Sequence, residues 1–181
     1  MARRTVANDI LIADIDRFLK EGREVVFLVK GYSMLPFITG WAESVELHRL
    51  ERQPKRGDII LAKVDTGHFV LHRVISVDAD NIVTLMGDGN IRGVEHCKPE
   101  DIIGIALYAV DCQGRKRDLY TPWRKVASRM WWKLLPFRRY LLAAYRRTLM
   151  KRTLHKAGVK TDGWKVVEND PMQRTTINKN E

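Results

Sequence analysis

Short runs of strand-forming residues, separated by turn-forming residues, recur from residue 25 to residue 110 and constrain the fold most. Each run holds five to nine residues rich in Val, Ile, Leu and aromatic side chains, as half-buried strands do. "DTG" at 65–67 and "DAD" at 78–80 suit tight turns between antiparallel neighbours. The pattern predicts a mainly β fold. The expected strands are 25–29, 44–50, 58–64, 69–77, 81–86 and 102–110, with a further one over 116–120.

Helical patterns flank this β region on both sides. Apolar residues recur at helical spacing over residues 6–20, which predicts a short amphipathic helix. A second helical pattern begins after Pro122, and Pro136 should kink or interrupt it. We therefore expect four parts. These are an N-terminal helix (1–24), a β-domain (25–120), a basic amphipathic helical extension (121–156) and a flexible tail (157–181).

Positive charge is concentrated in one segment near the C-terminal end. The 181 residues carry a net charge of +10, yet residues 115–156 hold 14 Lys and Arg and a single acid, Asp118. Trp, Tyr and Phe are interspersed among these basic residues, as in helices that bind an anionic membrane surface. Residues 123–152 are the expected contact. Packing of the helix on the β-domain with a solvated basic face is the main alternative, and a nucleic-acid contact is the least favoured one.

No stretch of the sequence is typical of a targeting or membrane-spanning segment. The N-terminal residues contain acids at Asp9, Asp14 and Asp16, which a signal peptide would lack. No run of about 18 uncharged apolar residues follows. Two cysteines, Cys97 and Cys112, are too few for a disulfide framework. These features favour a cytoplasmic protein with reduced thiols, held at most peripherally on a membrane.

A lone serine follows the first expected strand, in the stretch "VKGYSMLPFI" (29–38). Ser33 is set in a turn that Pro36 should make rigid, because proline fixes its own φ angle. Such a serine either caps the turn or is held out of the sheet so that its hydroxyl can react. A hydroxyl is a weak nucleophile at neutral pH, so the second interpretation requires a neighbouring base.

Four segments in order carry a resemblance that selects the second interpretation. "GYSMLP" resembles the G-x-S-M-x-P signature of the LexA-type and type I signal peptidase superfamily of serine peptidases. "RGDIILAKV" (56–64), "VLHRVISV" (70–77) and "LMGDGN" (85–90) resemble three further segments of that superfamily, in the same order. Together they cover about half of the chain. The resemblance implies a LexA/signal-peptidase-like β-domain that hydrolyses peptide bonds through an acyl-enzyme.

The resemblance also implies roles for individual residues. Ser33 corresponds to the nucleophile and His72 to the general base of the Ser-His branch, and histidine suits this task because its imidazole is largely neutral at pH 7. Lys63 is the alternative base. Asp88 is the expected carboxylate that orients His72, and Glu95 is a weaker candidate for a second acid. The remaining histidines have no expected role. They are His48, His68, His96 and His155.

Three residues beside Ser33 are expected to shape the substrate and oxyanion region. Tyr32 precedes the nucleophile, Met34 should form an apolar plug, and Pro36 should hold the turn. Backbone N–H groups around Ser33 would stabilise the oxyanion of the tetrahedral intermediate. The resemblance implies a peptide or protein substrate and no metal or cofactor.

Two other functions remain as alternatives at this point. A LexA-like regulator that cleaves itself is one, but only 24 residues precede the first expected strand, fewer than a helix-turn-helix module needs. Ala157-Gly158 matches the dipeptide such regulators cleave, yet it follows the catalytic segments, and we interpret it as coincidence. The other alternative is a non-enzymatic β-scaffold that binds a membrane or a partner through its basic helix. Processing of a precursor or signal peptide is the favoured role.

Overall fold

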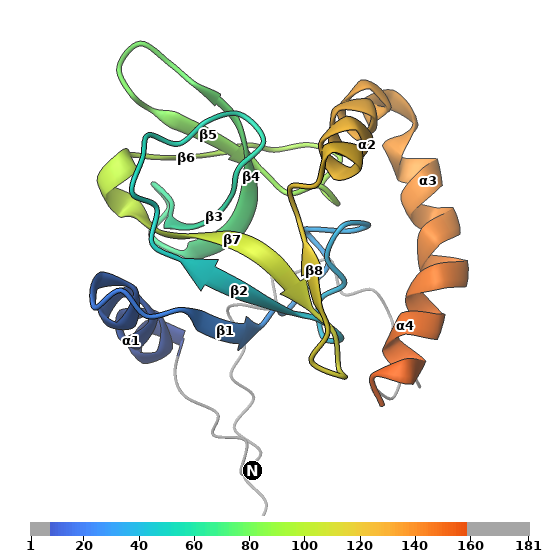
Figure 1. Cartoon of the computed structure of the whole chain (residues 1–181). Helices are drawn as coiled ribbons and strands as arrows, with labels where there is room; N and C mark the ends of the chain where they lie inside the picture. Colours follow the sequence, from blue (N-terminus) through green and yellow to red (C-terminus); the bar gives the residue numbers. More distant parts are fainter. Residues whose placement is uncertain (1–7, 159–181) are drawn as a thin grey trace, which may run out of the picture.

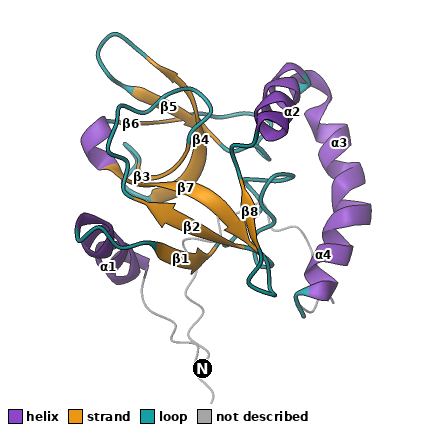
Figure 2. Cartoon of the chain, in the orientation of Figure 1, coloured by secondary structure: helices purple, strands orange, loops and turns teal. Residues whose placement is uncertain are grey.

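The computed structural model describes residues 8–158 as one mainly β domain with helices before and after it (Figures 1 and 2). Helix α1 (Asn8–Lys20) precedes the sheet. The strands are β1 (Val25–Leu28), β2 (Ser44–His48), β3 (Ile59–Lys63), β4 (Phe69–Val77), β5 (Val83–Met86), β6 (Glu95–Cys97), β7 (Ile102–Val110) and β8 (Lys116–Asp118). Between β6 and β7, a short 3-10 turn spans Pro99–Asp101.

A helical arm, residues 122–156, follows the sheet. It comprises α2 (Pro122–Lys133), a 3-10 turn (Leu135–Phe137), α3 (Arg138–Tyr145), a π-helical turn (Arg146–Met150) and α4 (Lys151–Lys156). Pro136 lies in the 3-10 turn, so the expected interruption of the helix is confirmed. The arm runs along one side of the sheet, beside β8 (Figure 1). Within residues 8–158, no helix is both long enough and apolar enough to cross a membrane.

All strand pairs in the sheet are antiparallel. The strand order is β1-β2-β7-β3-β4-β5-β6, and β8 pairs with the C-terminal half of β7. The long strand β7 thus holds the two halves of the sheet together, pairing with β2 on one edge and β3 on the other. Because β3 pairs with β4 in a register that sets Ile60 opposite His72, the candidate base lies near the middle of a well-supported strand.

Two hydrophobic clusters form the core, one on each face of β3. Ile59 and Leu61 belong to the first cluster, and Ile60 and Ala62 to the second, as the alternation of side chains along a strand requires. Helix α1 closes the first cluster with side chains at helical spacing. Those that are buried in it are Ile12, Ile15 and Leu19.

Most of the elements expected from the sequence are confirmed, within two or three residues at their ends. The N-terminal helix, the six main strands, the short strand β8 and the C-terminal helices all form. Strand β6 was not predicted, because its three residues, Glu95–Cys97, carry little strand signal. Cys97 and Cys112 are free thiols, as expected. The expected flexible tail lies, from residue 159 on, outside the described residues.

Candidate active site

Ser33 lies in a tightly bonded turn that leaves β1 and returns to β2. The backbone N–H groups of Phe37 and Ile38 both donate to Met34 O at 3.0 Å, and that of Leu35 donates to Tyr32 O at 3.2 Å. The Leu35–Pro36 peptide bond is cis. Met34, Leu35 and Ile38 are buried, whereas Ser33 is only half-buried. The buried side chains of the turn therefore anchor it in the core, while Ser33 stays partly accessible to solvent.

His72 is buried on β4, with 5% of its surface exposed, and its hydrogen-bond partner comes from β6. Its Nδ1 atom lies 2.9 Å from Glu95 Oε2. Glu95 reaches this position because β6 pairs with β5, which sets Glu95 opposite Leu85. A carboxylate at Nδ1 fixes the tautomer of the ring, so that Nδ1 carries the proton and Nε2 is the free base.

Gly87 shows that Ser33 and His72 converge. A β-carbon at position 87 would lie 3.0 Å from His72 Nε2 and 3.0 Å from Ser33 Cβ. The free ring nitrogen and the serine side chain therefore lie around one point beside the Gly87 backbone. Within residues 8–158 no hydrogen bond joins the two side chains. Hydrogen bonds of this kind often form only when a substrate is bound.

The loop 87–90, which carries "GDGN", packs directly on the Ser33 turn. The N–H of Gly89 donates to Ser33 O at 2.6 Å. A β-carbon at position 89 would lie 2.4 Å from Tyr32 O, and one at position 87 would lie 2.4 Å from Ser33 O. Only glycine permits so close an approach of two backbones at these positions. The two glycines of this motif thus fix the distance between the candidate nucleophile and base.

The structure does not place Asp88 against His72, contrary to the sequence-based expectation. Both oxygens of the Asp88 carboxylate instead accept hydrogen bonds from Arg73, with Nε at 2.9 and 3.1 Å and Nη2 at 2.7 Å. Arg73 and His72 are neighbours on β4, so their side chains point to opposite faces of the strand. Asp88 follows Arg73 to one face, and Glu95 meets His72 on the other. The carboxylate that contacts His72 is Glu95.

Burial and charge act on these ion pairs in opposite directions. Burial raises the pKa of Glu95, but the hydrogen bond and the attraction to His72 outweigh it, so that the pKa lies below the ordinary value. Burial lowers the pKa of Arg73, but the Asp88 carboxylate outweighs it and raises the pKa overall. The Glu95 carboxylate therefore faces a partner that favours its charged form.

The other residues expected near the site have mixed placements. Met34 is 2% exposed and belongs to the first core cluster, so it supports the turn from below. Tyr32 and Pro36 are half-buried beside Ser33, and burial raises the pKa of Tyr32, partly offset by the positive charge of Arg146. In residues 8–158 no hydrogen bond is donated by the N–H of Ser33 or Met34, so both are available for an oxyanion.

Lys63 does not approach Ser33. It is exposed at the end of β3 and pairs with Phe69, whereas His72 pairs with Ile60. Lys63 lies three positions after Ile60, about 10 Å along the strand. Because this spacing is odd, the side chains of Lys63 and Ile60 point to opposite faces of the sheet. The arrangement favours His72 over Lys63 as the base.

The helical arm packs on the β-domain beside the candidate site. Packing on the β-domain was one of the three alternatives that the sequence left open for this segment. Trp131 Nε1 donates to Asp88 O at 2.8 Å, and Arg138 Nη1 donates to Asn90 O at 2.8 Å. The Trp131 ring also meets Phe37 edge to face. Farther along, the Tyr145 hydroxyl lies 3.2 Å from Thr39 Oγ1. One face of the arm therefore packs on both the loop 87–90 and the Ser33 turn.

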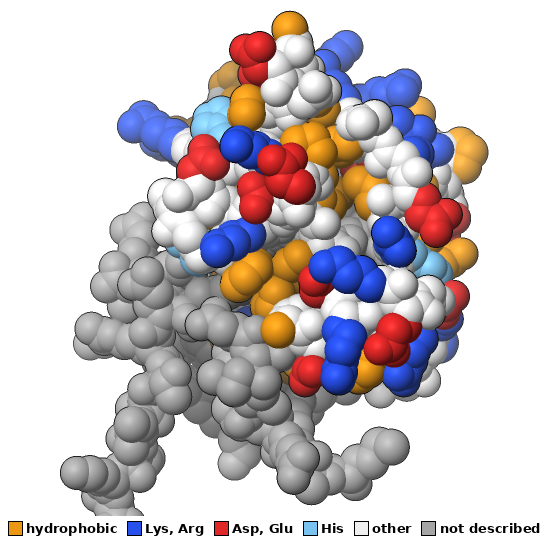
Figure 3. All heavy atoms as spheres, turned by 90° about the vertical axis from the view of Figure 1, so that its left-hand side faces the viewer, with side chains coloured by type: hydrophobic (Ala, Val, Ile, Leu, Met, Phe, Trp, Pro, Cys, Tyr) orange, Lys and Arg blue, Asp and Glu red, His pale blue; other side chains and the backbone are white. Residues whose placement is uncertain are grey.

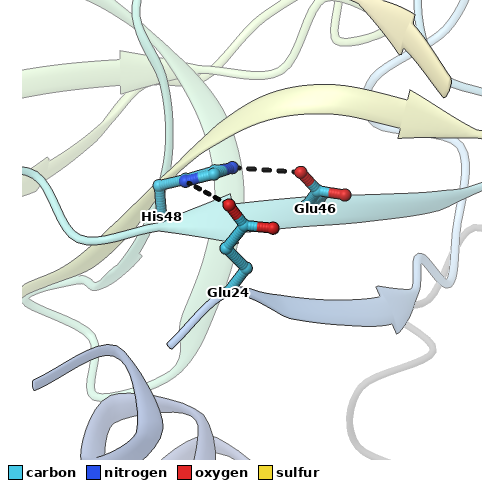
Figure 4. Close-up of side chains that lie close together, drawn as sticks. All are labelled: Glu24, Glu46 and His48. Atoms are coloured by element: carbon cyan, nitrogen blue, oxygen red, sulfur yellow. Dashed lines mark hydrogen bonds and ion pairs between the residues drawn. The ribbon is translucent and has the colours of Figure 1, made fainter. Parts of the chain in front are cut away.

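A separate cluster of charged side chains lies on β2 and just before β1 (Figure 4). His48 Nε2 is 3.1 Å from Glu46 Oε1, and His48 Nδ1 is 3.7 Å from Glu24 Oε1. The types of side chain would suit a metal ion. However, the two carboxylates lie at opposite nitrogens of the ring, and Lys116 already pairs with Glu46 at 2.5 Å. The geometry is that of an ion-pair network joining β2 to its neighbours.

Comparisons of the chain with protein-family models, with curated proteins and with solved structures find no match.

Proposed function

We propose that the chain is a serine endopeptidase of the LexA and signal-peptidase type, with Ser33 as nucleophile, His72 as general base and Glu95 as the residue that positions His72. The observation that carries the proposal is the convergence of His72 Nε2 and the Ser33 side chain at Gly87, while Nδ1 of the same ring meets a carboxylate. The order of the four sequence segments supports the same assignment. Precursor or signal-peptide processing is the proposed role.

The proposed reaction follows from the positions of these groups. Ser33 Oγ attacks the carbonyl carbon of the peptide bond while His72 Nε2 accepts its proton. Glu95 keeps the proton on Nδ1 and stabilises the imidazolium that forms. The N–H groups of Ser33 and Met34 stabilise the oxyanion. The imidazolium then gives its proton to the leaving amine, and a water molecule hydrolyses the acyl-enzyme by the same route.

The sheet offers a place for the substrate backbone. Strand β1 ends the strand order and pairs only with β2 among the described strands. Its residues lead directly into the Ser33 turn. An extended peptide that paired with this edge would carry its scissile bond toward Ser33. The proposed substrate is therefore a peptide or protein segment that is extended around the cleaved bond.

A fluorophosphonate probe tests the proposal without knowledge of the substrate. The probe should label the wild-type chain at Ser33, and Ser33→Ala should remove the label while leaving the melting temperature nearly unchanged. Ser44→Ala, a matched change on β2, should still be labelled. Peptide mass mapping gives the labelled residue. No labelling of the wild type would favour the non-enzymatic β-scaffold. Labelling that persists in folded Ser33→Ala protein would place the reactive group at another residue and overturn the assignment of Ser33.

The pH dependence should report His72. As the pH falls toward about 5, kcat/KM should fall by about tenfold per pH unit, because a protonated imidazole cannot accept the serine proton. The pKa of Glu95 is lowered from its ordinary value of 4.5. The stability that the ionised carboxylate contributes is therefore fully present above pH 4.5 and is lost as the pH falls through the lowered pKa. The loss of activity therefore precedes any acid unfolding through Glu95. Activity that appears only at alkaline pH and survives His72→Ala would point to Lys63.

A further inference from the structure

The helical arm has two faces, and only one of them is used by the domain. Ser128, Arg138, Leu142 and Leu154 are buried along the inner face. The opposite face leaves large apolar side chains in solvent, with Trp123 exposed to 76% and Phe137 to 61%. The others of this kind in the arm are Val126, Met130, Leu134, Tyr140, Leu141 and Leu149. We call this set the outer apolar face.

The first helix of the arm orders these side chains into separate rows. Trp123, Val126 and Met130 are spaced by three and four residues, so they form one exposed row along α2. Lys125, Arg129 and Lys133 are spaced by four residues and form a second row, the cationic row. A third row, with Ser128 and Trp131, faces the domain.

The cationic row lines a groove between the arm and the sheet. This groove has a volume of about 730 Å³ and lies between α2, the start of β3 and the middle of β4. Lys55 and Arg56 add two more positive charges from the opposite wall. The one acid of the lining, Asp58, is already paired with Arg52 at 2.7 Å. Val74, Leu119 and Trp132 add apolar side chains to the lining.

The charge of the whole arm has one sign. Residues 122–156 hold 11 Lys and Arg and no Asp or Glu. By contrast, acidic and basic side chains are interspersed on the face of the molecule away from the arm (Figure 3). A surface that combines exposed aromatic residues, positive charge of one sign and a groove lined by cationic and apolar side chains is complementary to an anionic lipid bilayer.

We infer that the outer apolar face and the cationic row form a docking surface for an anionic membrane. Trp123, Met130 and Phe137 insert among the headgroups, and the groove takes up lipid phosphates. The inner face stays on the domain throughout, so docking requires no release of the arm. The inference does not depend on peptide hydrolysis, because its test measures lipid binding alone.

Binding to vesicles of phosphatidylcholine, with and without phosphatidylglycerol, tests this surface. The full-length protein should bind the anionic vesicles and dissociate as added salt screens the charges. Lys125→Gln/Arg129→Gln/Lys133→Gln should weaken binding by about 100-fold, because each cation near an anionic surface contributes about fivefold. Trp123→Ser/Phe137→Ser should weaken it by at least about tenfold.

A matched triple variant separates the docking surface from net charge. Arg49→Gln/Lys63→Gln/Lys98→Gln removes the same charge from exposed positions of the β-domain and should weaken binding only a few-fold. Equal losses in the two triple variants would overturn the inference, as would failure of the full-length protein to bind anionic vesicles. Tighter binding of a short RNA or DNA oligonucleotide than of anionic vesicles would also overturn it and would identify the groove as a nucleic-acid contact.

Discussion

Glu95→Gln should lower kcat/KM by about 10⁴-fold while the protein remains folded. Glutamine is close in size to glutamate and can still bond to the His72 ring, but its amide nitrogen favours the tautomer in which Nδ1 is the acceptor and Nε2 carries the proton. That tautomer cannot take the proton from Ser33. The amide also leaves the imidazolium without a counter-charge. The expected loss is set by analogy with other serine triads.

The measurement is cleavage of a peptide substrate by the variant and the wild type across a range of pH. If Glu95 acts through His72, the acid limb of the plot of kcat/KM against pH should move to lower pH in Glu95→Gln. The reason is that the neighbouring negative charge no longer favours the protonated ring. A merely structural role would leave that limb in place. Glu100→Gln, an exposed glutamate in the neighbouring 3-10 turn, is the matched control and should retain full activity. Less than about tenfold loss in Glu95→Gln would contradict the assignment.

Asp88→Asn should act mainly on stability, with a loss of about 3–5 kcal/mol in the free energy of unfolding. Asp88 is fully buried, and its ion pair within residues 8–158 is with Arg73, which is 4% exposed. Removal of the carboxylate charge leaves the Arg73 guanidinium buried without a counter-ion, which is more costly than removal of both charges. Urea unfolding followed by circular dichroism measures the change.

A second substitution distinguishes this mechanism from a general loss of packing. Arg73→Met/Asp88→Asn should recover part of the stability lost in Asp88→Asn alone, since the buried Arg73 guanidinium is removed together with the charge that it paired with. Asp14→Asn removes an exposed pair with Arg17 on α1 and should change stability little. If folded Asp88→Asn protein hydrolyses peptide more slowly than Glu95→Gln does, the roles of the two carboxylates are the reverse of those assigned here.

The sheet was largely predictable because its signals are local. The alternation around Ile59 to Ala62, the turn residues after β3 and β4, and the break at Pro136 each specify structure within a few residues. The three residues of β6 were missed because two of them are polar and the strand forms only by pairing with β5. Their place is set by tertiary contacts, which no short window of sequence contains.

The candidate site was predictable to the extent that its residues lie in ordered motifs. Ser33 and His72 were assigned from their segments, and the structure brings their side chains together. The choice between Asp88 and Glu95 required knowledge of which face of a strand each carboxylate meets. That choice depends on Arg73, whose guanidinium forms an ion pair with Asp88, and on the unpredicted strand β6, which carries Glu95. Sequence proximity to a motif does not contain this information.

The bonds from the helical arm to the loop 87–90 have a consequence for the order in which the protein is completed on the ribosome. The Asp88 and Asn90 carbonyls receive donors from Trp131 and Arg138, which lie 43 and 48 residues later in the chain. The β-domain therefore leaves the exit tunnel before the side chains that hold its loop exist outside the ribosome. The arm also buries Leu142 and Leu154, so a nascent chain that ends near Tyr120 lacks part of its core as well. Synthesis of the last helices thus completes the packing around the loop 87–90.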